Sequence, residues 1–168
     1  AAAAREAGAT VLEHHPLDRV AHDGARFEAE AAGARFVAPV LLNCAGYWGR
    51  HLAATFGEEV PLAPLHPNMI VTEPLPHFCR HNLGVVGGDL YLRQVARGNV
   101  VFGGGRGDGE ADGTRTRPNA AVSAAAMARA VELIPHLAGA MVIRSWTGTD
   151  GETPDHQPVL GPSRTTSG

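Results

Sequence analysis

Near its end the chain reads Arg144-Ser-Trp-Thr-Gly148-Thr-Asp-Gly-Glu-Thr-Pro154-Asp155-His-Gln-Pro158-Val-Leu-Gly161. Within this stretch, Trp-x-Gly, Thr-Pro-Asp and Pro-Val-Leu-Gly follow one another at a spacing that chance rarely assembles. Two earlier segments are patterned in the same way. They are Asn43-Cys-Ala-Gly46-Tyr-Trp48 and Tyr91-Leu-Arg-Gln-Val-Ala-Arg-Gly98-Asn-Val-Val-Phe-Gly-Gly-Gly105. Their order along the chain supports treating the three segments as one signature.

The composition limits the classes of protein to which this chain can belong. Its 168 residues are enough for a sizeable core and would normally form one domain. A net charge of −3, from 14 basic and 17 acidic residues, together with dispersed arginines, excludes a nucleic-acid-binding stripe. The longest apolar run, Val37–Leu42, contains a proline and is too short to span a bilayer. Two cysteines make no disulfide framework and no signal-peptide pattern is present, so we expect a cytoplasmic protein.

The first third of the chain predicts a helix, a small meander and a buried strand. The alanine-rich residues 1–7 form a helix that ends at Gly8. The continuous apolar run Val40–Ala45 is typical of a buried strand in an α/β sheet, and Cys44 would be a small buried residue on it. The other expected elements are strands at residues 10–13, 18–22, 26–30 and 35–38 and a helix at residues 49–56.

The remainder predicts a more antiparallel part. Five prolines between Val60 and Pro76 exclude a helix there and favour edge or linking segments. Residues 118–133 form the clearest helix, with Pro118 in its first turn and an apolar face at Ala124, Met127, Ala128, Val131 and Ile134. We further expect strands at residues 66–72, 89–95, 99–103 and 140–146, a hairpin tip at Arg97-Gly98 and a surface loop at residues 106–117.

The three motif segments resemble the signatures of the FAD-dependent amine and amino-acid oxidoreductases. This family includes glycine oxidase, the sarcosine oxidase β subunit, D-amino-acid dehydrogenases, opine oxidase and hydrogen cyanide synthase, and the last two are the most similar branch. The resemblance implies an α/β fold, a Rossmann-like FAD-binding domain with an inserted antiparallel-sheet substrate domain. Residues 1–58 and 146–168 would belong to the former and residues 59–145 to the latter. The implied activity is oxidation of the C–N bond of an amino acid or secondary amine.

One family motif is missing from the chain. Members bind the FAD pyrophosphate with a G-x-G-x-x-G turn that opens a helix. Gly103–Gly107 does not have this spacing, and no helix pattern follows it. We therefore expect an internal fragment that is inactive by itself. The alternative is a non-catalytic assembly subunit that binds partner subunits without holding flavin, since related branches act as hetero-oligomers.

Cofactor contacts follow from the resemblance. The turn Cys44-Ala45-Gly46 would pass near the FAD ribose and pyrophosphate with Trp48 beside it, and Val20 would meet the adenine. An ordinary strand-to-helix glycine with a core tryptophan remains the alternative. Gly148 would line the pocket near the flavin ring, and Asp155 would hold the following loop. No cysteine follows Cys79, which predicts non-covalent FAD.

Substrate contacts are implied for Tyr91, whose hydroxyl would point at the substrate carboxylate, and for Trp146, which would line the pocket. A simple cross-strand aromatic pair is the alternative for Tyr91. Glycine oxidase-like members carry a carboxylate-binding arginine two residues after Trp-x-Gly, but Asp150 occupies that position here. Because an aspartate cannot bind a carboxylate at neutral pH, either Arg93 or Arg144 binds it, or the substrate is held in a different way.

Other site chemistries have weaker support. His77-Phe-Cys79-Arg-His81 offers three alternating ligands, but a structural zinc site needs a fourth and a tighter pair spacing, so no metal is expected. No nucleophile elbow or H-E-x-x-H motif supports a hydrolase.

Overall fold

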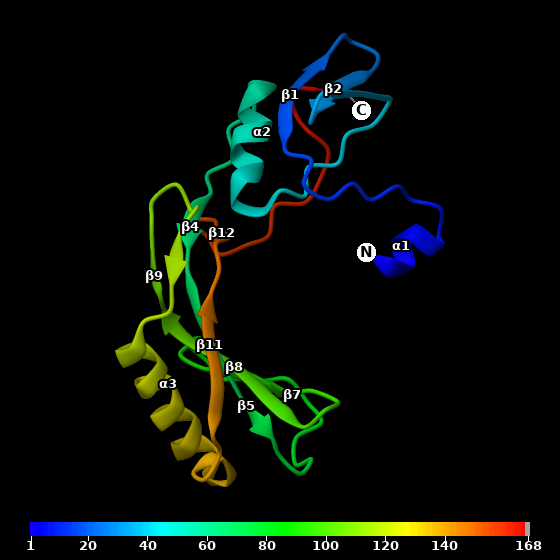
Figure 1. Cartoon of the computed structure of the whole chain (residues 1–168). Coiled ribbons are helices and arrows are strands. Elements are labelled where there is room, and N and C mark those ends of the chain that lie inside the picture. The colour runs from blue at the N-terminus through cyan, green and yellow to red at the C-terminus, as the bar shows by residue number, and fades with distance from the viewer. Residues whose placement is uncertain (167–168) are drawn as a thin grey trace. The chain divides into compact units, whose positions relative to one another are not determined.

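A computed structural model describes residues 1–166, and these form two compact units (Figure 1). Unit 1 contains residues 1–61 and the residues from 158 onward, whereas unit 2 contains Leu62–Gln157. The sequence predicted boundaries after residues 58 and 145, whereas the two units meet after residues 61 and 157. The assignment of the parts to a cofactor domain and a substrate domain stays a prediction. Within residues 1–166, no helix is long and apolar enough to cross a membrane.

Unit 1 contains a three-stranded antiparallel meander in the order β1-β2-β3. The β2–β3 hairpin turns at Ala32 and Gly33, whose φ angles of 49° and 78° match the left-handed geometry of tight hairpin turns. The expected meander and both helices are confirmed. The elements are α1 (Ala2–Glu6), β1 (Leu17–His22), β2 (Phe27–Ala31), β3 (Ala34–Ala38), the short 3₁₀ helix η1 (Gly46–Trp48) and α2 (Gly49–Thr55).

Two expectations for unit 1 are wrong. Residues 10–13 form no strand, and neither does the apolar run Val40–Ala45. Val40 and Leu42 are 56% and 81% exposed, and Cys44 is exposed rather than buried. A strand exists only when its backbone pairs with a neighbour, and no strand of the described residues pairs with this run.

Unit 2 is built on a five-stranded antiparallel sheet in the order β11-β5-β8-β7-β6. Its β7–β8 hairpin turns at Gly98, which has a φ of +92°, as the sequence predicted. Two small pairs, β4–β12 and β9–β10, complete the strands. The bounds are β4 (Ala63–Leu65), β5 (Pro67–Pro74), β6 (Leu83–Gly84), β7 (Tyr91–Gln94), β8 (Asn99–Arg106), β9 (Asp108–Gly109), β10 (Thr116–Arg117), β11 (Val142–Thr147) and β12 (Asp150–Glu152).

The proline-rich segment differs from its expectation. β5 lies inside the sheet, between β11 and β8, because Pro67 and Pro74 stand at its two ends and leave the middle of the strand free to donate hydrogen bonds. The expected surface loop at residues 106–117 also contains a short ladder, formed by β9 and β10.

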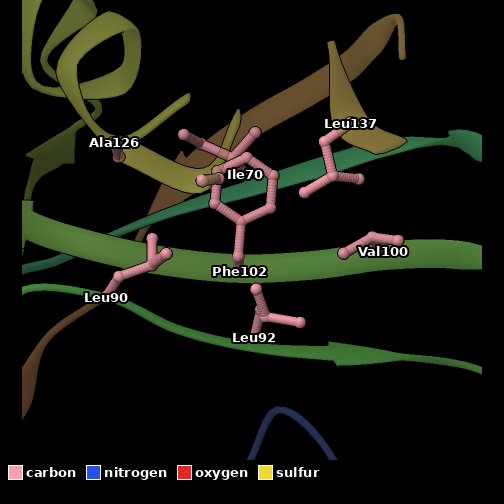
Figure 2. Close-up of a cluster of buried hydrophobic side chains, with 8 residues drawn as sticks. Ile70, Leu90, Leu92, Val100, Phe102, Ala126 and Leu137 are labelled. Atoms are coloured by element: carbon pink, nitrogen blue, oxygen red, sulfur yellow. The ribbon is translucent and has the colours of Figure 1, made fainter. Parts of the chain in front are cut away.

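One face of the sheet packs against α3 (Ala120–Leu133) and the 3₁₀ helix η2 (Pro135–Leu137). Figure 2 shows this core, in which Phe102 and Val100 are fully buried. The apolar face predicted for α3 is partly wrong. Ala126 and Ala130 are buried, whereas Ala124 and Ala128 are exposed. Alanines occur on every side of this helix, so their spacing in the sequence does not identify the buried face. The core comprises Ile70, Leu90, Leu92, Val100, Phe102, Ala126, Ala130 and Leu137.

A buried amide connects the sheet to the start of α3. Asn119 caps the helix, with its side-chain oxygen accepting from Val122 N at 3.1 Å, so Pro118 lies just before the helix and not in its first turn as expected. The fully buried Asn68 of β5 accepts from Asn119 N at 3.0 Å and donates to Ser123 Oγ at 3.0 Å. Asn68 therefore satisfies both the cap backbone and the first turn of the helix.

We predict that Asn68→Ala lowers the free energy of unfolding by about 1–3 kcal/mol, because it leaves the buried Asn119 N–H without its acceptor. Ser123→Ala is a comparison variant that keeps this acceptor but removes both hydrogen bonds of the Ser123 hydroxyl, one from Asn68 Nδ2 and one to the Asn119 carbonyl. Denaturant unfolding of the protein expressed from its complete reading frame gives both values. An unfolding free energy that Asn68→Ala leaves unchanged would contradict the role assigned to Asn68.

Candidate functional site

The register of the unit 2 sheet aligns residues that are far apart in sequence. Tyr91 lies opposite Gly103, Gly103 opposite Met69, and Met69 opposite Trp146. These four residues form one row across β7, β8, β5 and β11. The predicted substrate residues Tyr91 and Trp146 are therefore brought to the same row.

A second row lies two residues along each strand. Arg93 is opposite Val101, Val101 is opposite Val71, and Val71 is opposite Arg144. Residues two apart on a strand share a face, so both rows face the same side, and the residues between them, such as Phe102, pack against α3. We call the side with these two rows the open face. Arg93 and Arg144 lie three strand spacings apart on it, about 14 Å between backbones.

Tyr91 lies across the middle of the open face. Its hydroxyl donates to the Sδ of Met69 at 3.0 Å, and its side chain is 46% exposed. Burial raises the pKa of Tyr91 above its ordinary value, and the nearby negative charge of Asp150 adds to the rise. The hydroxyl is consequently protonated at neutral pH and available as a donor.

The two arginines of the open face differ in their surroundings. The Arg144 guanidinium lies over the Trp146 ring, 5.6 Å from its centroid, an arrangement that favours the cation. Arg93 is exposed and, within residues 1–166, makes no ion pair or side-chain hydrogen bond. Arg93 therefore has no side-chain partner among the described residues, whereas Arg144 is held over Trp146 with its N–H groups still available.

The segment after β11 is held by short polar contacts. Thr147 Oγ1 donates to the Pro67 carbonyl at 2.6 Å, and His66 Nδ1 lies 3.3 Å from the Gly148 carbonyl oxygen, with Thr149 Oγ1 3.4 Å from the same nitrogen. Asp150 follows on β12, exposed to solvent. The backbone that carries Trp146 and Gly148 is therefore tied to the start of β5.

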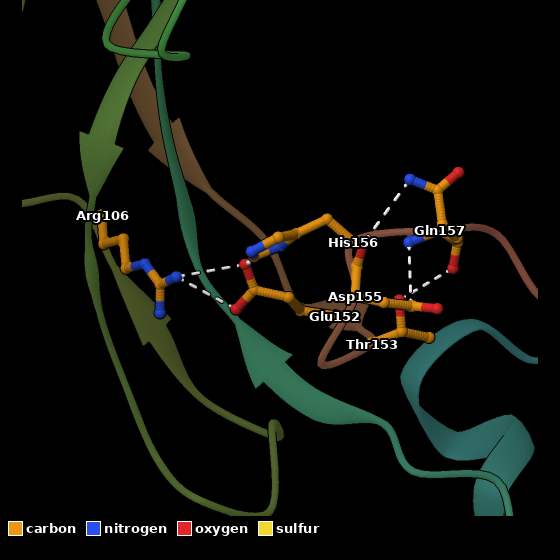
Figure 3. Close-up of polar contacts among 6 residues, drawn as sticks. All are labelled: Arg106, Glu152, Thr153, Asp155, His156 and Gln157. Carbon is orange, nitrogen blue, oxygen red and sulfur yellow. Dashed lines mark hydrogen bonds and ion pairs between the residues drawn. The ribbon is translucent and has the colours of Figure 1, made fainter.

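Asp155 closes the next turn (Figure 3). Its carboxylate accepts from Gln157 N at 3.2 Å, and hydrogen bonds from Gln157 and from Thr153 lower the pKa of Asp155. In the same region Glu152 pairs with Arg106 at 3.0 Å and with His156 at 3.3 Å. This position agrees with a loop-holding role for Asp155, whereas its contact with a cofactor stays a prediction.

The predicted cofactor turn of unit 1 is an exposed bend that leads into a short helix. Gly46 has a φ of +58°, a conformation that favours glycine, and Cys44 and Ala45 are exposed beside it. Asn43 braces the bend, because its Nδ2 donates to the Gly49 carbonyl at 2.8 Å. Trp48 is 43% exposed and so presents part of its ring to solvent.

Sequence reasoning missed the aromatic anchor of this turn. Tyr47 is completely buried, and the Arg50 guanidinium lies over its ring at 4.4 Å from the centroid. The adjacent Tyr47-Trp48 pair gave no signal for which ring points inward, since a 3₁₀ turn directs neighbouring side chains to different sides.

Unit 1 also contains a pocket of about 460 Å³, within the range of small-molecule sites. Val20, the residue expected to meet adenine, is buried on β1 and lines it. Aromatic and hydroxyl side chains complete the wall. The lining residues are Val20, Ala21, His22, Gly24, Thr55, Phe56, Thr165 and Thr166.

The histidine-rich segment does not form a ligand cluster. His77 contacts the Ala96 carbonyl oxygen at 3.1 Å, and Cys79 Sγ donates to the His81 carbonyl at 3.2 Å. Across the described residues 1–166, no three His, Cys, Asp or Glu side chains are grouped as metal ligands.

Comparisons with known proteins connect these parts. The family described as FAD dependent oxidoreductase matches residues 1–168. Hydrogen cyanide synthase subunit HcnC of Pseudomonas protegens is 31% identical over 165 residues, which cover 95% of this chain and 38% of that protein. An opine oxidase subunit of Agrobacterium tumefaciens is 26% identical over 158 residues, which cover 94% of this chain and 40% of that protein. The chain thus spans about two fifths of the length of these relatives.

Solved structures share the fold. Glycine oxidase from Geobacillus kaustophilus superposes with a TM-score of 0.83 at 21% identity, covering 98% of this chain and 43% of that one. L-Proline dehydrogenase from P. horikoshii gives 0.82 at 20% identity, covering 97% and 44%. These likenesses confirm the predicted α/β fold class with its antiparallel part. Because the family match covers every residue, the chain belongs to the FAD-dependent oxidoreductases, as its three motifs predicted.

Proposed function

We propose that the protein oxidises the C–N bond of a small amino acid or secondary amine, with non-covalent FAD as its cofactor. The observation that carries this proposal is the open face, on which the sheet register gathers Tyr91, Arg93 and Trp146 on the side away from the core. Relatives whose names are glycine oxidase and opine oxidase support the substrate class.

The residues present fit part of an FAD site. The unit 1 pocket has the volume of a small-molecule site and Val20 in its wall, and the Gly46 bend leaves backbone accessible to a phosphate-bearing ligand. Val20, Cys44, Ala45, Gly46 and Trp48 would hold FAD in unit 1, and Gly148 and Asp155 would do so in unit 2. When bound, FAD supplies the acceptor for the hydride that leaves the substrate carbon.

Each residue of the open face has a role suited to its surroundings. The Arg93 guanidinium, which makes no ion pair or side-chain hydrogen bond among residues 1–166 and lies on the same strand as Tyr91, binds the substrate carboxylate. The protonated Tyr91 hydroxyl donates a second hydrogen bond to that carboxylate. Trp146 provides an apolar wall that keeps water from the reacting carbon.

The first prediction from this proposal concerns the flavin spectrum. The protein expressed from its complete reading frame is expected to show bound-flavin absorption that bleaches on anaerobic addition of a substrate amine. Sarcosine, glycine, D-amino acids and an opine form the test panel, with acetate as a non-amine control. A colourless protein would falsify the proposal.

The second prediction concerns the carboxylate contact. Arg93→Met should raise KM for the amine about 10- to 100-fold, the size expected for losing a hydrogen bond to a charged group. Arg144→Met is the matched control on the same row of the sheet and should change KM much less. If the two variants exchange these effects, Arg144 rather than Arg93 binds the substrate.

The third prediction concerns the charge at Asp150. Asp150→Asn should lower the pKa of Tyr91 by removing the nearby negative charge, while burial keeps that pKa above the ordinary 10.0. The Tyr91 Cζ signal in a ¹³C NMR pH titration, assigned with Tyr91→Phe, measures the change. Glu152→Gln is the control, because its carboxylate pairs with Arg106 instead. A Tyr91 titration that is identical in wild type and Asp150→Asn would contradict the electrostatic link.

An assembly role is a second candidate, favoured by relatives that are themselves named subunits. The exposed apolar residues Met141, Val142 and Ile143 at edge strand β11 offer a surface for another protein chain. A purified, defined complex that never holds flavin would favour this function over catalysis.

Both cysteines are free, which suits the reducing cytoplasm where we propose that the protein acts.

A further inference from the structure

We propose that Gly103 and Met69 are positioning residues that fix the Tyr91 hydroxyl over the middle of the open face. The inference rests on the proposed function, in which Tyr91 contacts the substrate. Gly103 leaves the space that the Tyr91 ring occupies, and Met69 holds the hydroxyl at the end of that ring.

The space beside Gly103 is the first observation. A Cβ at this position would lie 2.5 Å from both Cζ and Oη of Tyr91 and 2.8 Å from the Sδ of Met69. Real Cβ atoms essentially never approach other atoms so closely, so any side chain here displaces the tyrosine. The tip of the Tyr91 ring therefore lies directly over the Gly103 backbone.

The backbone itself does not require glycine at this position. Gly103 is absent from the positive-φ residues of the described chain, whereas its neighbour Gly105 has a φ of +70°. Glycine in a strand interior weakens the strand and often marks a close approach. Close approach of Tyr91 is thus the reason that the structure offers for glycine at position 103.

Met69 supplies the second contact. Its thioether sulfur accepts a hydrogen bond from the Tyr91 hydroxyl at 3.0 Å. Met69 lies on β5 and Tyr91 on β7, with β8 between them. A thioether is a weak acceptor, so it orients the hydroxyl and still yields it to a stronger acceptor such as a carboxylate. This arrangement presents a protonated donor at the centre of the open face before the substrate arrives.

The adjacent Gly104 provides a matched control. A Cβ there would lie 2.7 Å from the Asp89 carbonyl oxygen and 3.2 Å from the Ala126 Cβ, on the core side of the sheet. Gly104→Ala therefore strains the Asp89 backbone ahead of β7 and the packing of α3, with no direct contact with the Tyr91 ring, so it should affect Tyr91 less than Gly103→Ala does. Comparing Gly103→Ala with Gly104→Ala separates displacement of the tyrosine from general loss of stability.

The test uses the flavin-loaded protein expressed from its complete reading frame. Gly103→Ala should lower kcat/KM for the amine about 10- to 100-fold, the scale of a misplaced contact, and shift the ¹³C Cζ signal of Tyr91. Gly104→Ala should lower the unfolding midpoint and change both readouts much less than Gly103→Ala does. In a Tyr91→Ala background, Gly103→Ala should have a smaller further effect, because the clash with the tyrosine is gone and only the flexible Met69 side chain must move.

Met69→Leu keeps the volume but removes the acceptor, so it remains informative if Gly103→Ala does not fold. It should shift the Tyr91 signal and raise KM more than it lowers kcat. Tyr91 signals that stay at their wild-type positions in both Met69→Leu and Gly103→Ala would overturn the inference. If Tyr91→Phe leaves KM unchanged while those signals shift, the substrate role of Tyr91 fails and the positioning stands.

Discussion

The burial of alternate residues of β8 against α3 is the constraint on which the rest of unit 2 depends. Val100 and Phe102 are fully buried in the core, and Gly104 lets Ala126 approach the strand closely. Because side chains alternate along a strand, this packing sends Val101 and Gly103 to the other side. A slip of one residue would exchange the two faces, so the core determines which side chains reach the open face.

The open face combines a donor, cations and one negative charge. Burial raises the pKa of Tyr91 and the charge of Asp150 adds to the rise, so both disfavour its phenolate form. The Arg144 guanidinium lies over the Trp146 ring, whereas Arg93 is exposed two residues along β7 from Tyr91.

The proposed cofactor contacts of unit 1 depend on the shape of its backbone more than on charged side chains. The bend at Gly46 is braced by Asn43 and anchored by the buried Tyr47, so its exposed edge has a defined conformation. Val20 lines a pocket of about 460 Å³ in the same unit. These features suit a nucleotide cofactor. Such a ligand needs accessible backbone groups and a partly apolar pocket wall more than titratable side chains.

The sequence by itself determined the family through its three spaced motifs. It also determined local elements that are bounded by turn-forming residues, such as the hairpin at Gly98. It failed at Val40–Ala45, because an apolar run becomes a strand only when another strand pairs with it. Only the tertiary structure decided that Tyr91, Gly103, Met69 and Trp146 share one row. Local signals act over a few residues, whereas this row depends on pairing between segments that are distant in sequence and on which face the core buries.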